Sequence, residues 1–218
     1  EVVARYRAIQ EKVFGSLGID FDHYSGTSTC EGHAELSQEF FTKILERGDI
    51  EEKETQQFFC DPCQRFLPDR YVEGTCPQCT AAGARGDQCD ACGQSYEQEE
   101  LKDPECAVCR ETPQIVSTRH WFFRLDRYEQ QLEDWLKSCE GWRDNVRNFA
   151  RGIIREGLPA RSITRDLEWG VPVPLAEAKD KVLYVWFDAP IGYISFTREY
   201  FQKLGEPEAW KSWWSDPE

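Results

Sequence analysis

The chain contains no methionine and only three histidines, and its 26 basic residues are outnumbered by 40 acidic ones. It has no run of 18 apolar residues and no signal-peptide pattern, so a soluble protein that does not enter a membrane is expected. The formal charge of −14 opposes non-specific nucleic-acid binding, because an acidic surface repels phosphates. The missing initiator methionine leads us to expect an excised fragment or a processed product.

Apolar residues, in contrast, are plentiful. Hydrophobic residues make up 40% of the 218 positions and aromatic residues 13%, with eight tryptophans, which is the composition of a chain that folds. This length is enough for one sizeable core, or for a core with a small second domain. The acidity suits a well-solvated surface and also suits a high-salt cytoplasm.

Eight of the ten cysteines form four Cys-x-x-Cys pairs, with 12, 9 and 13 residues between successive pairs. Each pair directs two thiolates at one centre, so two pairs complete a tetrahedral zinc site with no position open for water. Redox dithiols are the alternative, but they normally appear as one motif at a helix start. The sequence therefore predicts two structural Zn²⁺ sites. The predicted ligands are Cys60, Cys63, Cys76, Cys79, Cys89, Cys92, Cys106 and Cys109.

The pairing of these motifs is open, because sequential, crossed and nested arrangements all give two complete sites. The nine-residue gap before Cys89 has the length of a hairpin, which favours 76–92 as one inner site and leaves the outer two motifs for the second ion. Gly93, directly after Cys92, permits a tight backbone around a metal. Because thiolates persist only in a reducing compartment, a cytosolic location is expected.

Hydrophobic periodicity predicts helices and strands on both sides of the cysteines. The stretch 117–125 alternates as a strand does, and the apolar run 181–189 is expected to be a buried strand of a parallel sheet. A helix is expected to start at Asp188 or Ala189, where Pro190 suits the first turn, and ligands bind where such strands meet helices. The predicted helices are 3–18, 33–48, 126–139, 142–157 and 190–205.

Four segments carry a resemblance to a known family: FLPDRYVEGTCPQC (66–79), GDQCDACGQSYE (86–97), SITRDLEWGVPVP (162–174) and YVWFDAPIGYISF (184–196). They resemble the methionyl-tRNA synthetases, a family of class I aminoacyl-tRNA synthetases. The resemblance implies an α/β fold, in which part of a Rossmann-like catalytic domain carries an inserted small, mainly β, zinc-knuckle domain. It implies boundaries at 1–57, 58–112 and 113–218, and the eight thiols match the two-zinc type of the family.

Proteins of this family join methionine to ATP, with Mg²⁺, and transfer the methionyl group to the 3′ end of initiator and elongator methionine tRNAs in the cytoplasm. The resemblance implies these substrates and partners here. The HIGH-like and KMSKS-like motifs, with which the family stabilises the phosphates of ATP, do not occur in this sequence. The chain alone is therefore expected to be inactive.

The resemblance also assigns residues. Trp186, Ala189, Pro190 and Tyr193 match positions that shape the methionine pocket, where a thioether packs favourably on aromatic rings. Arg165 matches a catalytic arginine, whose permanent charge would stabilise the negative groups of the adenylate. The alternatives are that the two rings are ordinary core aromatics and that Arg165 braces its own loop through Asp166.

Two other functions compete with this one. An independent zinc-ribbon module that binds nucleic acid or protein would explain the cysteines, but it would leave YVWFDAPIGY unexplained, and its usual basic surface is absent. A class I synthetase for leucine, isoleucine, valine or cysteine is the second competitor. The first three carry a large editing domain at this insertion, and the cysteine enzyme needs a zinc ion with an open position.

Overall fold

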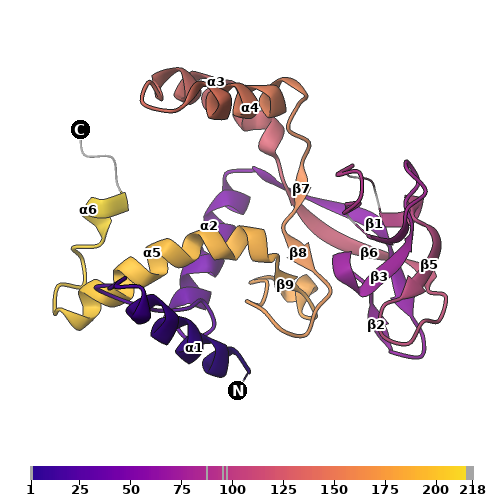
Figure 1. Ribbon diagram of the computed structural model, residues 1–218, viewed down its shortest axis with the longest axis horizontal. Helices are drawn as coiled ribbons and strands as arrows, with labels where there is room; N and C mark the ends of the chain where they lie inside the picture. The colour runs from indigo at the N-terminus through magenta and orange to yellow at the C-terminus, as the bar shows by residue number, and fades with distance from the viewer. Residues whose placement is uncertain (1, 87, 95, 97, 215–218) are drawn as a thin grey trace. The chain divides into compact units, whose positions relative to one another are not determined.

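The computed structural model describes residues 2–86, 88–94, 96 and 98–214, and the chain divides into two compact units (Figure 1). Unit 1 consists of Glu1–Phe40 and Val185–Glu218, and unit 2 of Phe41–Tyr184. Each unit is described by itself. Among the described residues, no helix has both the length and the apolar character needed to cross a bilayer. The predicted boundaries at 57/58 and 112/113 stay a prediction.

Unit 1 is helical. It contains α1 (Val2–Ser16), the first part of α2 (His33–Glu46), α5 (Val185–Lys203) and α6 (Lys211–Trp214). One face of α5 is buried through Ile191, Gly192 and Ser195. The ring of His33 on α2 lies 2.8 Å from the Ser195 hydroxyl, Nδ1 to Oγ, which ties the two helices together.

The central sheet of unit 2 has the strand order β2-β1-β6-β7 and is antiparallel throughout. Its two long strands, β1 and β6, pair continuously from Ile50 opposite Phe123 to Phe59 opposite Gln114. The strand predicted at 117–125 is therefore confirmed, and it begins three residues earlier. The strands are β1 (Ile50–Cys60), β2 (Arg65–Phe66), β6 (Gln114–Phe123) and β7 (Arg161–Ser162).

Between β1 and β6 the chain forms a second, three-stranded antiparallel sheet with the order β4-β3-β5. Its strands are β3 (Val72–Thr75), β4 (Ala82–Arg85) and β5 (Lys102–Cys106), with short 3-10 helices at Asp69–Tyr71 and Gln98–Glu100. The core beneath it is small. Six of the cysteine side chains belong to this core or pack against it with Phe58, Leu67, Val72 and Leu101: Cys60, Cys63, Cys76, Cys89, Cys106 and Cys109.

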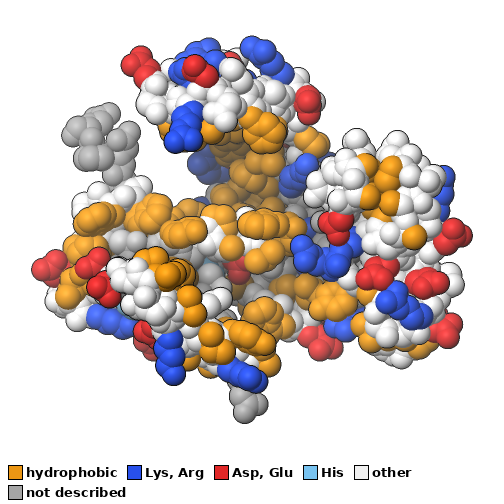
Figure 2. All heavy atoms as spheres, viewed as in Figure 1, with side chains coloured by type: hydrophobic (Ala, Val, Ile, Leu, Met, Phe, Trp, Pro, Cys, Tyr) orange, Lys and Arg blue, Asp and Glu red, His pale blue; other side chains and the backbone are white. Residues whose placement is uncertain are grey.

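After β6, a 3-10 turn (Leu125–Tyr128) leads into a hairpin of two helices, α3 (Glu129–Ser138) and α4 (Asp144–Arg155). Both helices were predicted, and the C-cap of α4, Glu156, is followed by Gly157, whose φ of 93° ends the helix. Leu136 of α3 is buried, and Arg151 of α4 faces Glu133 of α3 at 3.7 Å. Figure 2 shows hydrophobic side chains gathered on one side of this hairpin.

The expectation of a buried parallel strand at 181–189 is wrong. Only Val182–Leu183 form a strand, β9, and it pairs antiparallel with β8 (Thr164–Arg165) after a 3-10 turn at Ala176–Ala178. The helix α5 begins at Val185, so its start is also earlier than predicted and Pro190 lies inside it. A short apolar run is compatible with a strand or a helix, and here Val182 and Leu183 are buried in β9 while Val185 and Trp186 are exposed on α5.

Candidate metal centres and ligand-binding face

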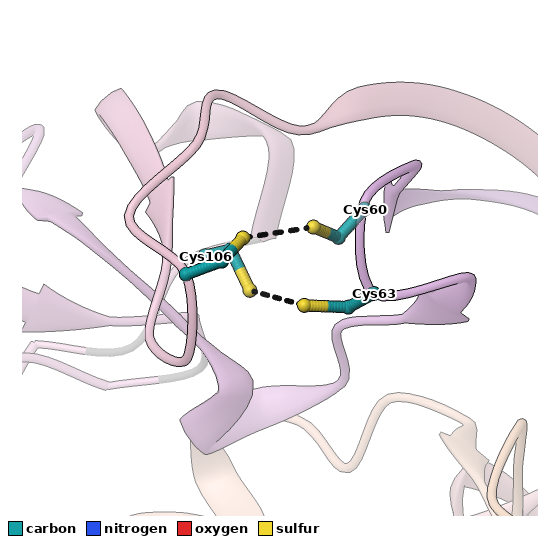
Figure 3. Close-up of side chains that lie close together, drawn as sticks. Cys60, Cys63 and Cys106 are labelled. Atoms are coloured by element: carbon teal, nitrogen blue, oxygen red, sulfur yellow. Dashed lines mark hydrogen bonds between the residues drawn. The ribbon is translucent and has the colours of Figure 1, made fainter.

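The first cysteine cluster lies where the chain leaves the long β1–β6 ladder and where it returns. Cys60 is the last residue of β1 and Cys106 the last residue of β5, and each begins a Cys-x-x-Cys turn. Figure 3 shows Cys60 and Cys63 on one turn, pointing toward Cys106 on the other. The sulfur of Cys60 lies 3.4 Å from that of Cys109, and the sulfur of Cys63 lies 3.9 Å from that of Cys106.

The second cluster joins the turn between β3 and β4 to the loop that follows β4. The sulfur of Cys76 is 4.0 Å from that of Cys92, and the sulfur of Cys79 is 3.7 Å from that of Cys89. In each cluster the four sulfurs all lie within 4.8 Å of one another. The structure thus brings together all eight predicted ligands, in the nested arrangement that the sequence favoured.

The backbone of all four turns has the same local geometry. The residue directly after the second cysteine of each pair has a left-handed conformation, with φ of 48° at Gln64, 61° at Thr80, 73° at Gly93 and 66° at Arg110. In three of the turns this residue also donates its N–H to the carbonyl of the first cysteine, at 2.8 to 3.1 Å. Only Gly93 adopts this conformation without steric cost, so the other three turns hold strained residues.

The spacing of the sulfurs matches a tetrahedral metal site. With Zn–S bonds of about 2.3 Å, the edge of an S₄ tetrahedron is about 3.8 Å, and the sulfur separations of 3.4 to 4.0 Å bracket this value. A disulfide requires about 2.05 Å, and all ten cysteines are free thiols. Two tetracysteine clusters with the chemistry and the dimensions of closed metal sites are therefore present.

Backbone donors favour the thiolate form at one cysteine of each cluster. The N–H of Cys79 is the main cause that brings the pKa of Cys76 down to about 7. Burial raises the pKa of Cys106, but the N–H groups of Cys109 and Val108 outweigh burial and bring that pKa to about 7 as well. A divalent cation at the centre of each cluster would displace the remaining protons, because metal ligation requires thiolates.

The four residues predicted to bind methionine share one face of α5. Trp186, Ala189, Pro190 and Tyr193 follow the spacing i, i+3, i+4 and i+7, which places side chains on a single side of a helix. Trp186 is 73% exposed and Tyr193 68% exposed, so neither ring is a core aromatic of the described chain. Figure 2 shows hydrophobic side chains exposed along this helix. The opposite face of α5 packs into unit 1.

Arg165, the predicted catalytic residue, lies in unit 2 at the end of β8. Its guanidinium carbon is 3.7 Å from the centre of the Tyr184 ring, and Nη1 donates to the carbonyl oxygens of Thr164 and Ser162 at 2.9 and 3.2 Å. Part of the predicted alternative, bracing of its own loop, is therefore present. The guanidinium is held in one orientation while the side chain stays half-buried.

Sequence reasoning missed a buried polar cluster that adjoins Arg165. His120 is 1% exposed and lies 2.9 Å from the carboxylate of Asp166, which also forms an ion pair with Lys181. Burial is the largest influence on His120 and lowers its pKa, which favours the neutral ring. A signal was available in the sequence, because Thr118 and His120 alternate on one face of a predicted strand.

The whole chain, residues 1–218, matches the protein family described as tRNA synthetases class I (M). The chain therefore belongs to this family of class I tRNA synthetases. It is 46% identical over 218 residues to the methionine–tRNA ligase of Methanopyrus kandleri, covering 98% of this chain and 32% of that protein. It is 47% identical over 218 residues to the methionine–tRNA ligase of Protochlamydia amoebophila, covering 100% of this chain and 31% of that protein.

Solved structures agree with the family. The apo methionyl-tRNA synthetase of Mycobacterium tuberculosis matches with a TM-score of 0.56 and 21% identity, over 95% of this chain and 35% of that one. The same enzyme bound by methionyl-adenylate matches with a TM-score of 0.56 and 22% identity, over 87% of this chain and 33% of that one. At this identity the likeness shows the fold alone. The chain spans about a third of the length of the curated relatives it matches.

Proposed function

We propose that this chain is part of the catalytic domain of a methionine–tRNA ligase, which joins methionine to ATP and transfers the methionyl group to tRNA. The observation that carries the proposal is the exposed face of α5, which bears Trp186 and Tyr193. It occurs in a chain that is 46% and 47% identical to two methionine–tRNA ligases. Because the family match covers every residue, an independent zinc-ribbon module has no observation in its favour. The proposed location is the cytoplasm.

On this proposal, the face of α5 forms one wall of the methionine pocket. The rings of Trp186 and Tyr193 flank the small side chains of Ala189 and Pro190 on this face, so a flexible thioether has an apolar surface to pack against. Sulfur–aromatic contacts are worth about 0.3–1.5 kcal/mol each. The pocket therefore selects methionine by packing and by shape, without a charged group.

Arg165 is proposed to stabilise the negative charge of the substrate carboxylate, the phosphates or the adenylate. A guanidinium stays charged at all relevant pH values, and one that is held against a ring and two carbonyls loses little entropy when it engages an anion. ATP and Mg²⁺ are proposed as substrates of the complete protein. Initiator and elongator methionine tRNAs are the proposed acceptors.

The finer architecture is also a proposal. Residues 1–57 and 113–218 would contribute to a Rossmann-like catalytic domain, and 58–112 would form the inserted zinc-knuckle domain. Support comes from the antiparallel β1–β6 ladder, since it lets the chain leave and re-enter the fold at one place. All strand pairs among the described residues are antiparallel, so any parallel sheet would need strands from outside this chain.

Each cysteine cluster is proposed to hold one structural Zn²⁺. The outer ion would be bound by Cys60, Cys63, Cys106 and Cys109, and the inner ion by Cys76, Cys79, Cys89 and Cys92. Four thiolates fill the coordination sphere, so zinc would supply cross-links between segments and no open position for catalysis. The small core around these sulfurs explains why cross-links are needed.

The test is methionine-dependent exchange of pyrophosphate into ATP, measured with the full-length parent polypeptide. Exchange with methionine, together with little or none with leucine, isoleucine or cysteine, is the expected result. Equal exchange with leucine or isoleucine would assign the chain to another class I synthetase. The complete absence of exchange in a folded, zinc-loaded protein would refute the proposed activity.

A further inference from the structure

A closed polar network is buried beside the loop that carries Arg165. The ring of His120 lies 2.9 Å from Asp166, Nε2 to Oδ2, and 2.8 Å from the hydroxyl of Thr164 through Nδ1. Lys181 forms an ion pair with Asp166 and donates to the Thr118 hydroxyl at 2.8 Å, and that hydroxyl donates to Asp166 at 3.1 Å. The side chains of His120, Asp166 and Lys181 are 1%, 8% and 11% exposed.

The hydrogen bonds fix the direction of each donor. The hydroxyl of Thr164 accepts the backbone N–H of Trp121 at 3.2 Å, so its own hydrogen is available to Nδ1 of His120. The Nε2–H of the ring then donates to the Asp166 carboxylate. The amide nitrogen of Gln57 lies 3.0 Å from Nε2 of His120. The amide oxygen of Gln57 is buried and has no hydrogen-bond partner in this orientation. If the oxygen and nitrogen of the Gln57 amide exchange places, the oxygen accepts the Nε2–H of His120. We therefore assign the flipped orientation of the Gln57 amide.

The two hydrogen bonds of the His120 ring straddle Arg165, because they end on Thr164 and Asp166, the residues on either side of it. The guanidinium in turn contacts the Thr164 carbonyl and the Tyr184 ring. We propose that His120 is a positioning residue for Arg165, holding both of its neighbours so that the guanidinium is presented in one orientation. This inference rests on the proposed function, in which Arg165 takes part in adenylate formation.

The composition of the network favours this role over simple stabilisation. A buried charged cluster generally stabilises a fold no better than apolar side chains of the same size would. It does fix geometry, because buried donors and acceptors stay hydrogen-bonded in only a few arrangements of their partners. Lys181 lies directly before β9 and Asp166 directly after β8, so the cluster also holds together the two strand ends next to Arg165.

The test uses the full-length parent polypeptide and compares the rate of methionyl-adenylate formation in Arg165→Ala, His120→Ala and the double variant. His120→Ala should lower this rate by up to about 100-fold, the usual effect of a small misplacement of a reacting group. The KM for methionine should change little. The double variant should be no slower than Arg165→Ala alone, because His120 has no guanidinium left to position once Arg165 is replaced.

Conservative variants separate the two hydrogen bonds of the His120 ring. His120→Asn keeps an acceptor for the Thr164 hydroxyl and His120→Gln keeps a donor for Asp166, so each should restore part of the rate. Lys181→Met tests the same network if His120→Ala does not fold. Tyr128→Phe is the matched control, since it removes a 2.7 Å hydrogen bond to Asp49 elsewhere in unit 2 and should leave the rate unchanged.

Two results would overturn the inference while leaving Arg165 in its role. One is full activity of a folded His120→Ala protein in which Arg165→Ala is slow. The other is a double variant whose rate is reduced by the product of the two single reductions, which would show that His120 acts independently of Arg165. If Arg165→Ala itself is fully active, its proposed role and the positioning inference both fall.

Discussion

The thiol of Cys60 lies 3.4 Å from that of Cys109, although 49 residues separate them in the sequence. The β1–β6 ladder causes this proximity, because Phe59 pairs with Gln114 and the chain therefore leaves and returns at one place. An antiparallel ladder brings the first and last cysteine motifs together and leaves the two inner motifs to each other. The nested arrangement follows from this topology.

Two zinc ions per chain should be found by elemental analysis of the purified protein. Cys106→Ser should release only the outer ion and Cys89→Ser only the inner one, because each cluster has its own four sulfurs. Structural zinc contributes about 10–16 kcal/mol of apparent binding free energy, so loss of an ion should unfold the segment around it. Loss of both ions from Cys106→Ser would contradict two separate sites.

Gly93→Ala should destabilise the inner site by about 1 kcal/mol, since a left-handed conformation is unfavourable for residues with a Cβ atom. No atom lies within 4 Å of the added methyl group, so the cost is conformational and not steric. Gly141→Ala is the matched control, with open space and no positive φ, and should be neutral or slightly stabilising. Denaturant titration at saturating zinc measures both. Equal effects of the two substitutions would contradict the prediction.

His120 should make the stability of unit 2 depend on pH. Burial lowers the pKa of His120 in the folded chain, so below the ordinary histidine pKa of about 6.5 the unfolded state binds a proton that the folded state does not. The stabilisation is therefore complete above that pH and is lost as the pH falls below it. His120→Gln, which does not titrate, should reduce this slope in denaturant unfolding. An unchanged slope would show that the pKa of His120 is the same in the folded and the unfolded chain.

Trp186→Ala should raise the KM for methionine in the full-length parent by at least about tenfold, which corresponds to about 1.4 kcal/mol. The KM for ATP should change far less, because the ring is assigned only to the side-chain pocket. Trp213→Ala is the matched control, since this ring is 71% exposed against 73% for Trp186. If the two variants bind methionine equally well, the pocket does not include Trp186.

Homocysteine should be rejected incompletely by the same pocket. A hydrophobic pocket gains only about 1–3 kcal/mol from one methylene, and homocysteine differs from methionine by a single methyl group. Its activation should therefore be measurable in the full-length parent by pyrophosphate exchange, at a lower kcat/KM than for methionine. Complete exclusion of homocysteine would require a recognition element beyond the packing surface of α5.

The sequence by itself determined the local features of this protein. Four Cys-x-x-Cys motifs define eight ligands whatever the fold, because the x-x spacing forms the turn that aims two sulfurs at one centre. The helices α2, α3 and α4 follow from apolar periodicity, and the motif YVWFDAPIGY identified the candidate residues of α5 through a family resemblance. All of these depend on neighbours close in the chain.

The tertiary structure decided what depends on distant partners. The β1–β6 ladder fixed the pairing of the cysteine motifs. The apolar run at 181–189 forms a two-residue strand and the start of a helix, in which Val185 and Trp186 are exposed and not buried in a sheet. The contact of His120 on β6 with Asp166, directly after β8, joins distant parts of the chain, and the alternation of residues along a strand does not specify such a partner. Long-range burial and hydrogen bonding set these features, and a single sequence specifies them only once it has folded.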